Sequence, residues 1–398
     1  MRILITTDCY TPMINGVVTS ILNLEMELRK LGHEVKILCP SENFHCCENE
    51  NVYRIGSVGI GKIYSGARAA LRINLGNLQK LIDWKPDIIH SQSEFFSFLM
   101  AKKISAVVGC PIVHTYHTVY ENYTHYFSPS ITLGRKAVIK LTKQILQHTE
   151  TVIAPSQKIK NMLKGYGVEQ PIQVVPTGLK SEKFFQFVSD NKVSELKLKL
   201  GIPQGKKVLI TVGRAAKEKN IDELIRYFKQ LDMENTVFLI VGGGPYLDVL
   251  KKLVISEKIS DKVIFTGTVS PDEINVYYKL GDVFLSATQS ETQGLTYMEA
   301  LASGLPAVCR KDECLNGVII EGRNGGQYTD FKEFSELIET IMYNDEFYKT
   351  LSENAVKTAQ KYSAEEFAKN VEAIYKDVLE KRNSHETENA LFDRQNCG

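Results

Sequence analysis

The sequence lacks an apolar run long enough to cross a membrane as a helix. Among its 398 residues, the longest charge-free apolar stretch is 104–113, which is ten residues, whereas a transmembrane helix needs about 20. The first apolar segment meets an acid at Asp8, too early for the apolar region of a signal peptide. We therefore expect neither a transmembrane helix nor a signal peptide.

The sequence also lacks cysteines at metal-binding or redox spacing. Its eight cysteines include no Cys-x-x-Cys motif, and several lie in strand-like apolar runs, which is typical of reduced thiols in a cytoplasmic protein. Hydrophobic residues are 43% and charged residues 24%, an ordinary globular composition that excludes disorder, collagen-like repeats and coiled coil as the main architecture.

Charge is balanced over the whole chain but not between its halves. Residues 1–178 carry 19 Lys and Arg against 13 Asp and Glu, and the remainder carries 29 against 34, so a net charge of +1 combines +6 and −5. The asymmetry either arises by chance or indicates that the first half meets an anionic surface. No nucleic-acid partner is expected.

Strand-like and helix-like segments alternate along the chain. A strand at 2–6 precedes apolar residues at helical spacing from Val17 to Leu31. Further strands are predicted at 34–38, 86–90, 111–117 and 151–155, and, after a Pro/Gly break at 174–178, at 207–213, 237–242, 263–267, 283–287 and 306–310. This pattern predicts an α/β protein with two doubly wound domains around a cleft, and ligands beyond the carboxyl ends of the strands.

The most informative motif is S-E-T-Q-G-L-T-Y-M-E-A at 290–300, which follows a strand and opens a helix. Gly294 permits a close backbone approach, and the N–H groups of a helix N-terminus favour a phosphate. Glu291 precedes the helix and Glu299 lies about one turn inside it, so both carboxylates can accept hydrogen bonds from one bound sugar or ribose. A capped helix with a solvated acidic face is the alternative.

Three further segments carry weaker signals. The loop at 213–220 (G-R-A-A-K-E-K-N) places three cations before a helix, which suits a diphosphate, although basic loops are common. The segment 242–245 (G-G-G-P) lacks the spacing of a dinucleotide fingerprint, which favours tight-turn packing over nucleotide contact. The segment 114–126 holds three histidines and four tyrosines. His117 there ends a predicted strand and is either a ligand contact or a core histidine. A zinc site shared with His114 is discounted, because residues three apart on a strand point to opposite faces.

Together these residues resemble the retaining glycosyltransferases of GT-B fold, and among them the bacterial monoglucosyldiacylglycerol synthases. The resemblance runs from residue 1 to about 380. It rests on 15–20 (N-G-V-V-T-S), 117–126, Arg214 with Lys219, and the glutamates at 291 and 299. One departure is Lys180, where many relatives have Asp; it leaves the hinge contacts open.

The resemblance implies transfer of a hexose, with glucose favoured, from a UDP-sugar to the free hydroxyl of 1,2-diacylglycerol with retention of the α configuration. No metal or other cofactor is required, and Mg²⁺ would at most stimulate. The catalytic residues implied are His117, Glu291, Arg214 and Lys219. The donor-binding residues implied are Gly16, Glu299, Gly294, Leu295, Thr296 and Gly243. The acceptor-binding residues implied are Tyr120, Tyr123, His125 and Tyr126.

The implied domains are an acceptor-binding, membrane-facing domain at 1–178, a donor-binding domain at 179–362, a helix at 363–382 that returns to the first domain, and a frayed tail at 383–398. We expect peripheral association with the inner face of the cell membrane through two basic segments with apolar periodicity. One is 63–82, with Arg68 and Arg72. The other is 133–146, with Lys136, Lys140 and Lys143 on one helical face and Val138, Leu141 and Ile145 on another. In each case a helix that only covers the sheet is the alternative.

Other functions remain open at this point. A glycosyltransferase with another lipid or a soluble acceptor would share every donor residue. A UDP-sugar epimerase or hydrolase and a non-catalytic nucleotide-sugar-binding regulator are further alternatives. The sequence does not distinguish glucose from galactose or UDP from another nucleotide, and it leaves the oligomeric state open.

Overall fold

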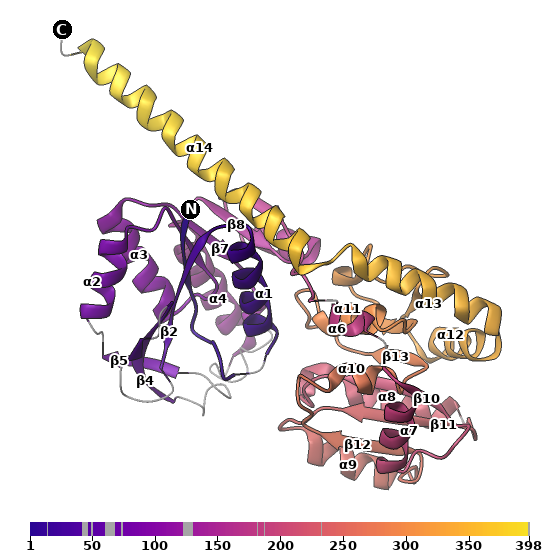
Figure 1. The fold of residues 1–398 in the computed structure, drawn as a ribbon. Helices are drawn as coiled ribbons and strands as arrows, with labels where there is room; N and C mark the ends of the chain where they lie inside the picture. The colour runs from indigo at the N-terminus through magenta and orange to yellow at the C-terminus, as the bar shows by residue number, and fades with distance from the viewer. Residues whose placement is uncertain are drawn as a thin grey trace. The chain divides into compact units, whose positions relative to one another are not determined.

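The computed structural model describes residues 1–13, 15–41, 47–48, 51–59, 68–72, 75–121, 130–180, 182–186, 188–231 and 233–396. The chain divides into two compact units, Met1–Gly178 together with Ala364–Gly398, and Leu179–Ser363. Each unit is an α/β layer structure in which helices cover both faces of one sheet (Figure 1).

The first unit is built on a mainly parallel sheet with the strand order β3-β4-β2-β1-β6-β7-β8-β9, and β5 pairs with β4. Only β3 and β5 run antiparallel to their neighbour among the described strands. The strands are β1 (Arg2–Thr6), β2 (Glu34–Pro40), β3 (Cys47–Glu48), β4 (Val52–Gly59), β5 (Arg68–Arg72), β6 (Ile88–Ser91), β7 (Ile112–Thr115), β8 (Thr151–Ala154) and β9 (Ile172–Val174). The helices are α1 (Gly16–Lys30), α2 (Leu75–Trp84), α3 (Phe96–Val108), α4 (Ile131–Leu146), α5 (Gln157–Gly165) and α14 (Ala364–Asn396).

The alternation of side chains along β1 explains how this sheet is covered on both faces. Ile3 and Ile5 point to the core that includes α1 and α14, whereas Leu4 points to the core that includes α2 and α3. The helix α14 contributes a buried aromatic ring, Tyr375, whose hydroxyl lies 2.6 Å from Nδ1 of the buried His90 in β6. The last helix of the chain therefore completes the core of the first unit.

The second unit has a fully parallel sheet among its described strands, in the order β12-β11-β10-β13-β14-β15. The strands are β10 (Lys207–Val212), β11 (Thr236–Val241), β12 (Val263–Gly267), β13 (Val283–Ser286), β14 (Ala307–Arg310) and β15 (Gly325–Tyr328). The helices are α6 (Glu182–Phe185), α7 (Asp190–Lys199), α8 (Ile221–Leu231), α9 (Leu247–Ser256), α10 (Ile274–Tyr278), α11 (Leu295–Ala302), α12 (Phe331–Tyr343) and α13 (Asp345–Gln360).

Two expectations about local structure are wrong. The segment 63–82 is not one helix, because Arg68–Arg72 forms β5 and pairs with β4, and only Leu75–Trp84 is helical. The side chains of this segment recur at helical spacing, but its backbone pairs with β4, and this pairing determines that it is a strand. The tail predicted to fray from 383 instead continues α14 to Asn396 (Figure 1). No Pro or Gly interrupts 364–396, so nothing in the sequence stops the helix.

Among the described residues, no helix combines the length and the apolar character that spanning a bilayer requires.

Candidate active site

The second sheet reverses its winding direction between β10 and β13. Successive strands after β10 are added on one side as β11 and β12, and β13, β14 and β15 are added on the other side. In doubly wound folds, ligands bind beyond the carboxyl ends of the two strands at such a reversal. The loops that leave these two strands, 213–220 and 287–294, contain Arg214, Lys219 and Glu291.

Hydrogen bonds hold these two loops together. Thr288 Oγ1 donates to the carbonyl oxygen of Glu218 at 3.2 Å, and Ser290 Oγ lies 3.4 Å from the same oxygen. From the other loop, Asn220 Nδ2 donates to the carbonyl oxygen of Ala287 at 3.2 Å. The two predicted segments, far apart in sequence, therefore form one surface of the second unit.

The charged side chains on this surface are paired but remain accessible. Lys219 Nζ forms an ion pair with Glu291 Oε1, and Arg214 Nη2 lies 3.9 Å from Glu218 Oε1. The Arg214 side chain is 36% exposed and that of Lys219 is 28% exposed, so both cations can meet an anion from solvent. Glu291, in the loop after β13, thereby holds the side chain of Lys219, which belongs to the loop after β10.

Gly294 is required by the local backbone. Its φ of +81° is in the left-handed region, and a Cβ at this position would lie 2.3 Å from Cε2 of Tyr297. Tyr297 is fully buried, and its hydroxyl lies 3.1 Å from Oγ of Ser286 in β13, so the ring cannot move aside. Gly294 caps α11 without a side-chain hydrogen bond, which leaves the first N–H groups of the helix, at Leu295 and Thr296, available to an external acceptor.

Glu299 lies on α11 and accepts a hydrogen bond of 2.7 Å from the hydroxyl of Tyr278 in α10. Burial raises the pKa of the Glu299 carboxyl, while the Tyr278 hydrogen bond and the charge of Lys183 act in the opposite direction. Glu299 keeps partial solvent access. The carboxylate is thus fixed in direction by one donor and has acceptor capacity left for ligand hydroxyls.

The three glycines after β11 pack against the loop that contains Arg214. A Cβ on Gly242 would lie 1.9 Å from the carbonyl oxygen of Gly213, and one on Gly244 would lie 2.4 Å from that of Ala215. A Cβ on Gly243 would lie 2.3 Å from Thr268 Oγ1. Close packing accounts for all three glycines. The donor-binding role of Gly243 stays a prediction.

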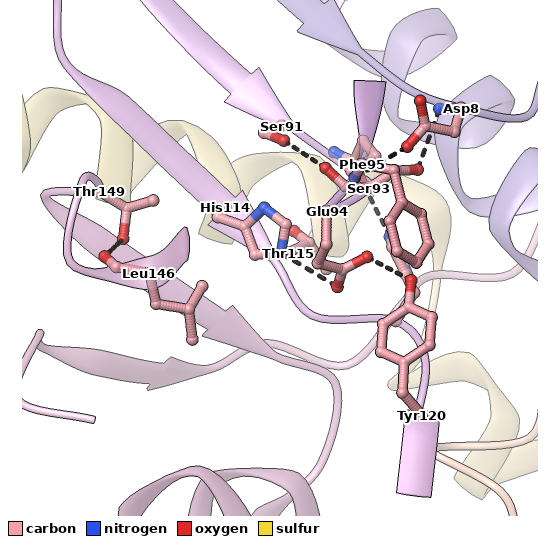
Figure 2. Close-up of polar contacts among 12 residues, drawn as sticks. Asp8, Ser91, Ser93, Glu94, Phe95, His114, Thr115, Tyr120, Leu146 and Thr149 are labelled. Atoms are coloured by element: carbon pink, nitrogen blue, oxygen red, sulfur yellow. Dashed lines mark hydrogen bonds and ion pairs between the residues drawn. The ribbon is translucent and has the colours of Figure 1, made fainter. Parts of the chain in front are cut away.

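The first sheet also reverses its winding direction, between β1 and β6. Asp8 follows β1, and one of its carboxylate oxygens accepts a hydrogen bond from the backbone N–H of Phe95 at 3.1 Å (Figure 2). The other accepts a hydrogen bond from the backbone N–H of Ser97 at 2.9 Å, at the start of α3. Burial raises the pKa of Asp8 to about 6, although these hydrogen bonds oppose the rise. Asp8 therefore joins the ends of the two strands at the expected ligand-binding edge.

A buried carboxylate lies beside Asp8. Glu94 Oε1 is 3.3 Å from His114 Nε2 in β7, and Glu94 Oε2 accepts a hydrogen bond from the hydroxyl of Tyr120 (Figure 2). The ring of Tyr120 also packs edge-on against Phe95, with 5.4 Å between the ring centroids. The predicted acceptor residue Tyr120 is thus fixed at this edge by a carboxylate that is only 7% exposed.

His117 lies two residues beyond β7 at the same edge. Its Nε2 is 2.6 Å from Oε1 of Gln92, which follows β6 directly. Burial lowers the pKa of His117 to about 3, so the ring is neutral at physiological pH. His114 is fully buried within the sheet, and His117 retains partial solvent access, which distinguishes the core histidine from the accessible one.

Comparison with known proteins identifies the family. A family model described as "Glycosyl transferases group 1" matches residues 192–358, and one described as "Glycosyltransferase Family 4" matches residues 14–183. The α-monoglucosyldiacylglycerol synthase of Acholeplasma laidlawii is 35% identical over 393 residues, covering 96% of this chain and 98% of that protein. The synthase of the same name from Streptococcus pneumoniae is 36% identical over 385 residues, covering 95% and 86%. The chain belongs to the GT-B glycosyltransferases, in the family of the monoglucosyldiacylglycerol synthases.

Solved structures agree with this assignment of the fold. HepE from Anabaena, in complex with UDP and glucose, matches with a TM-score of 0.74 and 17% identity, covering 95% of this chain and 100% of that one. The sucrose-phosphate synthase of Thermosynechococcus elongatus matches with a TM-score of 0.75 and 18% identity, covering 96% and 99%. At these identities the likeness concerns the fold alone.

Several predicted residues of this glycosyltransferase fall outside the part of the chain that the structure describes. Tyr123, His125 and Tyr126 are outside the described residues, and so are the side chains of Arg68 and Arg72. Those three remain predictions for the acceptor site. The two arginines lie in strand β5, so the prediction of a helical membrane segment around them is wrong.

The second basic segment of the glycosyltransferase is helical, as α4. Val138 and Ile145 are buried there, but Leu141, predicted on the same face, is 45% exposed, and Leu133 is 66% exposed. The lysines at 136, 140 and 143 are also exposed. Leu141 is exposed because it lies at the margin of the stripe that Val138 and Ile145 bury. The helix therefore presents leucines and lysines together to solvent.

Four residues at the two sites were missed by sequence reasoning. Gln92 and Glu94 lie two and four residues beyond the strand predicted at 86–90, and Asp8 lies two residues beyond the one predicted at 2–6, so the strand-end rule alone could have identified them. Tyr278 had no such signal, because its contact with Glu299 joins two helices that are separate in sequence. Among the described residues, no group of three or more His, Cys, Asp or Glu side chains is arranged to hold a metal ion.

Proposed function

We propose that this glycosyltransferase moves glucose from UDP-glucose to the free hydroxyl of 1,2-diacylglycerol at a membrane surface, with retention of the α configuration. The proposal for the donor rests on the joined pair of loops after β10 and β13. Arg214 lies beside Glu218 in the first loop, and Lys219 pairs with Glu291, three residues before the Gly294 cap of α11. The acceptor is proposed from the names of the two relatives that match nearly the whole chain.

The donor residues suit a nucleoside diphosphate sugar. Arg214, Lys219 and the first N–H groups of α11 supply positive charge where the departing diphosphate becomes more negative, which is the electrostatic stabilisation a glycosyl transfer needs. Glu299 would accept hydrogen bonds from ribose hydroxyls, and Glu291 from sugar hydroxyls. In this mechanism the acceptor attacks from the face that the diphosphate leaves, and the diphosphate oxygen takes the acceptor proton.

The test is a matrix of radiolabelled nucleotide sugars against candidate acceptors. Lipid-extractable label that appears only with UDP-glucose and diacylglycerol supports the proposal. Label in another lipid or in a soluble product changes the acceptor, and release of free glucose without an acceptor indicates a hydrolase.

The membrane contact is proposed for α4. The segment 131–146 has four cations and no acid, and its exposed Leu133 and Leu141 lie among the exposed lysines. Each cation near an anionic membrane contributes about 1 kcal/mol to the free energy of binding, and exposed leucines insert into the membrane interface. The helix therefore has both properties of a reversible membrane anchor.

Vesicle flotation tests this contact. We expect wild type to float with anionic vesicles at low salt, and the triple variant Lys136/Lys140/Lys143→Glu to stay in solution. The matched control Lys192/Lys197/Lys199→Glu changes the charge equally on α7 of the second unit and should float like wild type. Equal flotation of the wild type and the α4 variant would exclude α4 as the anchor.

A further inference from the structure

Gln92 is a buried polar residue directly after β6. It is 2% exposed, and its backbone N–H donates to the carbonyl oxygen of Thr6 at 2.8 Å, which ties it to the end of β1. Its side-chain carbonyl Oε1 lies 2.6 Å from Nε2 of His117. Because β6 and β7 are adjacent parallel strands, the residues beyond their ends meet at the same edge of the sheet.

Stability alone does not explain a glutamine at this position. The other end of its amide, Nε2, is buried and has no hydrogen-bond partner among the described residues. An unsatisfied buried donor is unfavourable, and a methionine of similar volume would avoid it. An arrangement that is unfavourable in this way is expected where a side chain serves a function.

The contact determines which nitrogen of His117 carries its proton. A carbonyl oxygen only accepts hydrogen bonds, so the 2.6 Å contact requires the proton on Nε2. A neutral imidazole has a single ring proton, so Nδ1 then keeps its lone pair and acts as an acceptor. His117 retains partial solvent access, so a ligand can reach the ring.

We infer that Gln92 is a positioning residue that holds His117 as the Nε2–H tautomer and thereby keeps Nδ1 as a hydrogen-bond acceptor for a hydroxyl of the sugar substrate. This inference rests on the proposed function, in which His117 contacts the sugar. Gln92 acts only through the imidazole. Its loss should lower turnover and leave the nucleotide contacts of the second unit unchanged.

The tautomer can be measured directly by long-range ¹H–¹⁵N correlation on the full chain labelled at histidine, with His117→Ala to assign the signals. The wild type should show the Nε2–H tautomer. Gln92→Met should show a mixture, because the acceptor is lost. Gln92→Glu should restore the Nε2–H form, because a carboxylate accepts the same hydrogen bond. A wild-type Nδ1–H tautomer, or an unchanged tautomer in Gln92→Met, would overturn the inference.

Kinetics on the same variants separate positioning from folding. Gln92→Met should lower kcat about three- to tenfold, the size expected for one lost hydrogen bond. The Kd for UDP should stay unchanged, and the melting temperature should be unchanged or higher, because the unsatisfied Nε2 is removed. Ser91→Ala is the matched control, since Ser91 is equally buried at the end of β6 and its hydroxyl bonds the Ser93 carbonyl oxygen. It should keep wild-type kcat.

The two hypotheses fail in different ways. If the wild type transfers no glucose to diacylglycerol, the proposed function is wrong, whatever the tautomer. If the wild type transfers glucose and Gln92→Met retains the full kcat, Gln92 has no positioning role and the proposed function still stands.

Discussion

Replacing Glu299 by glutamine tests how the donor nucleotide is bound. The carboxylate is held by the 2.7 Å hydrogen bond from Tyr278, and an amide oxygen at the same place can accept that bond. Burial raises the pKa of Glu299, which means that the folded protein disfavours its charge. Removing the charge should therefore leave the melting temperature unchanged or slightly higher.

Binding of UDP should become weaker in the same variant. A hydrogen bond to a charged group contributes about 1.5–3 kcal/mol, so Glu299→Gln should raise the Kd for UDP by about tenfold or more. Calorimetric titration measures this. Glu339→Gln on α12, where the glutamate is exposed, is the matched control and should keep the wild-type Kd.

UDP analogues that lack one ribose hydroxyl test the same contact from the side of the nucleotide. If Glu299 accepts from the ribose, wild type should bind 2′-deoxy-UDP or 3′-deoxy-UDP more weakly than UDP, and Glu299→Gln should lose most of that difference. A role of Glu299 in ribose binding is excluded if Glu299→Gln binds UDP as wild type does. It is also excluded if the variant keeps the full penalty for both deoxynucleotides.

Three further predictions concern stability and turnover. Gly294→Ala should lower the free energy of unfolding in urea by about 1–3 kcal/mol, because the left-handed φ and the Tyr297 ring both oppose a Cβ. The control Gly322→Ala, with a φ of +67° and nothing within 4 Å of the new Cβ, should lower it less. Equal losses in the two variants would contradict the clash with Tyr297. His117→Ala should lower kcat about tenfold with the Kd for UDP intact, whereas joint loss of UDP binding and melting temperature would indicate a structural histidine. The pKa of Asp8, raised from 3.8 to about 6, means that the folded state binds this proton more tightly. The stability of wild type relative to Asp8→Asn should then increase by up to about 3 kcal/mol as pH falls from 8 to 4, and a constant difference across this range would contradict the assignment.

The strand-and-helix order could be predicted because most buried segments here are short apolar runs between turn residues. It failed at Arg68–Arg72, where the side chains fit a helix but pairing with β4 provides the backbone hydrogen bonds of a strand. It failed again after residue 383, where the polar composition favours a frayed tail, although no Pro or Gly ends α14 before Asn396.

The site could be predicted wherever one short segment carries both the backbone geometry and the chemistry. Gly294 with Glu291 is such a case, since the turn and the carboxylate lie three residues apart. The contacts that fix the side chains could not be predicted, because they join separate elements. Tyr278 reaches Glu299 from another helix, and Gln92 reaches His117 across adjacent strands. The packing of α10 against α11 and the order of the strands show that these residues are neighbours, and the sequence states neither.

The proposed reaction is the transfer of glucose from UDP-glucose to diacylglycerol with retention. The most direct measurement is incubation of the purified full chain with UDP-glucose and diacylglycerol in mixed micelles, followed by proton NMR of the extracted glycolipid. We expect one product whose anomeric proton has the small coupling constant of an α-glucoside. A β-glucoside, or no glycolipid while UDP-glucose is consumed, would contradict it.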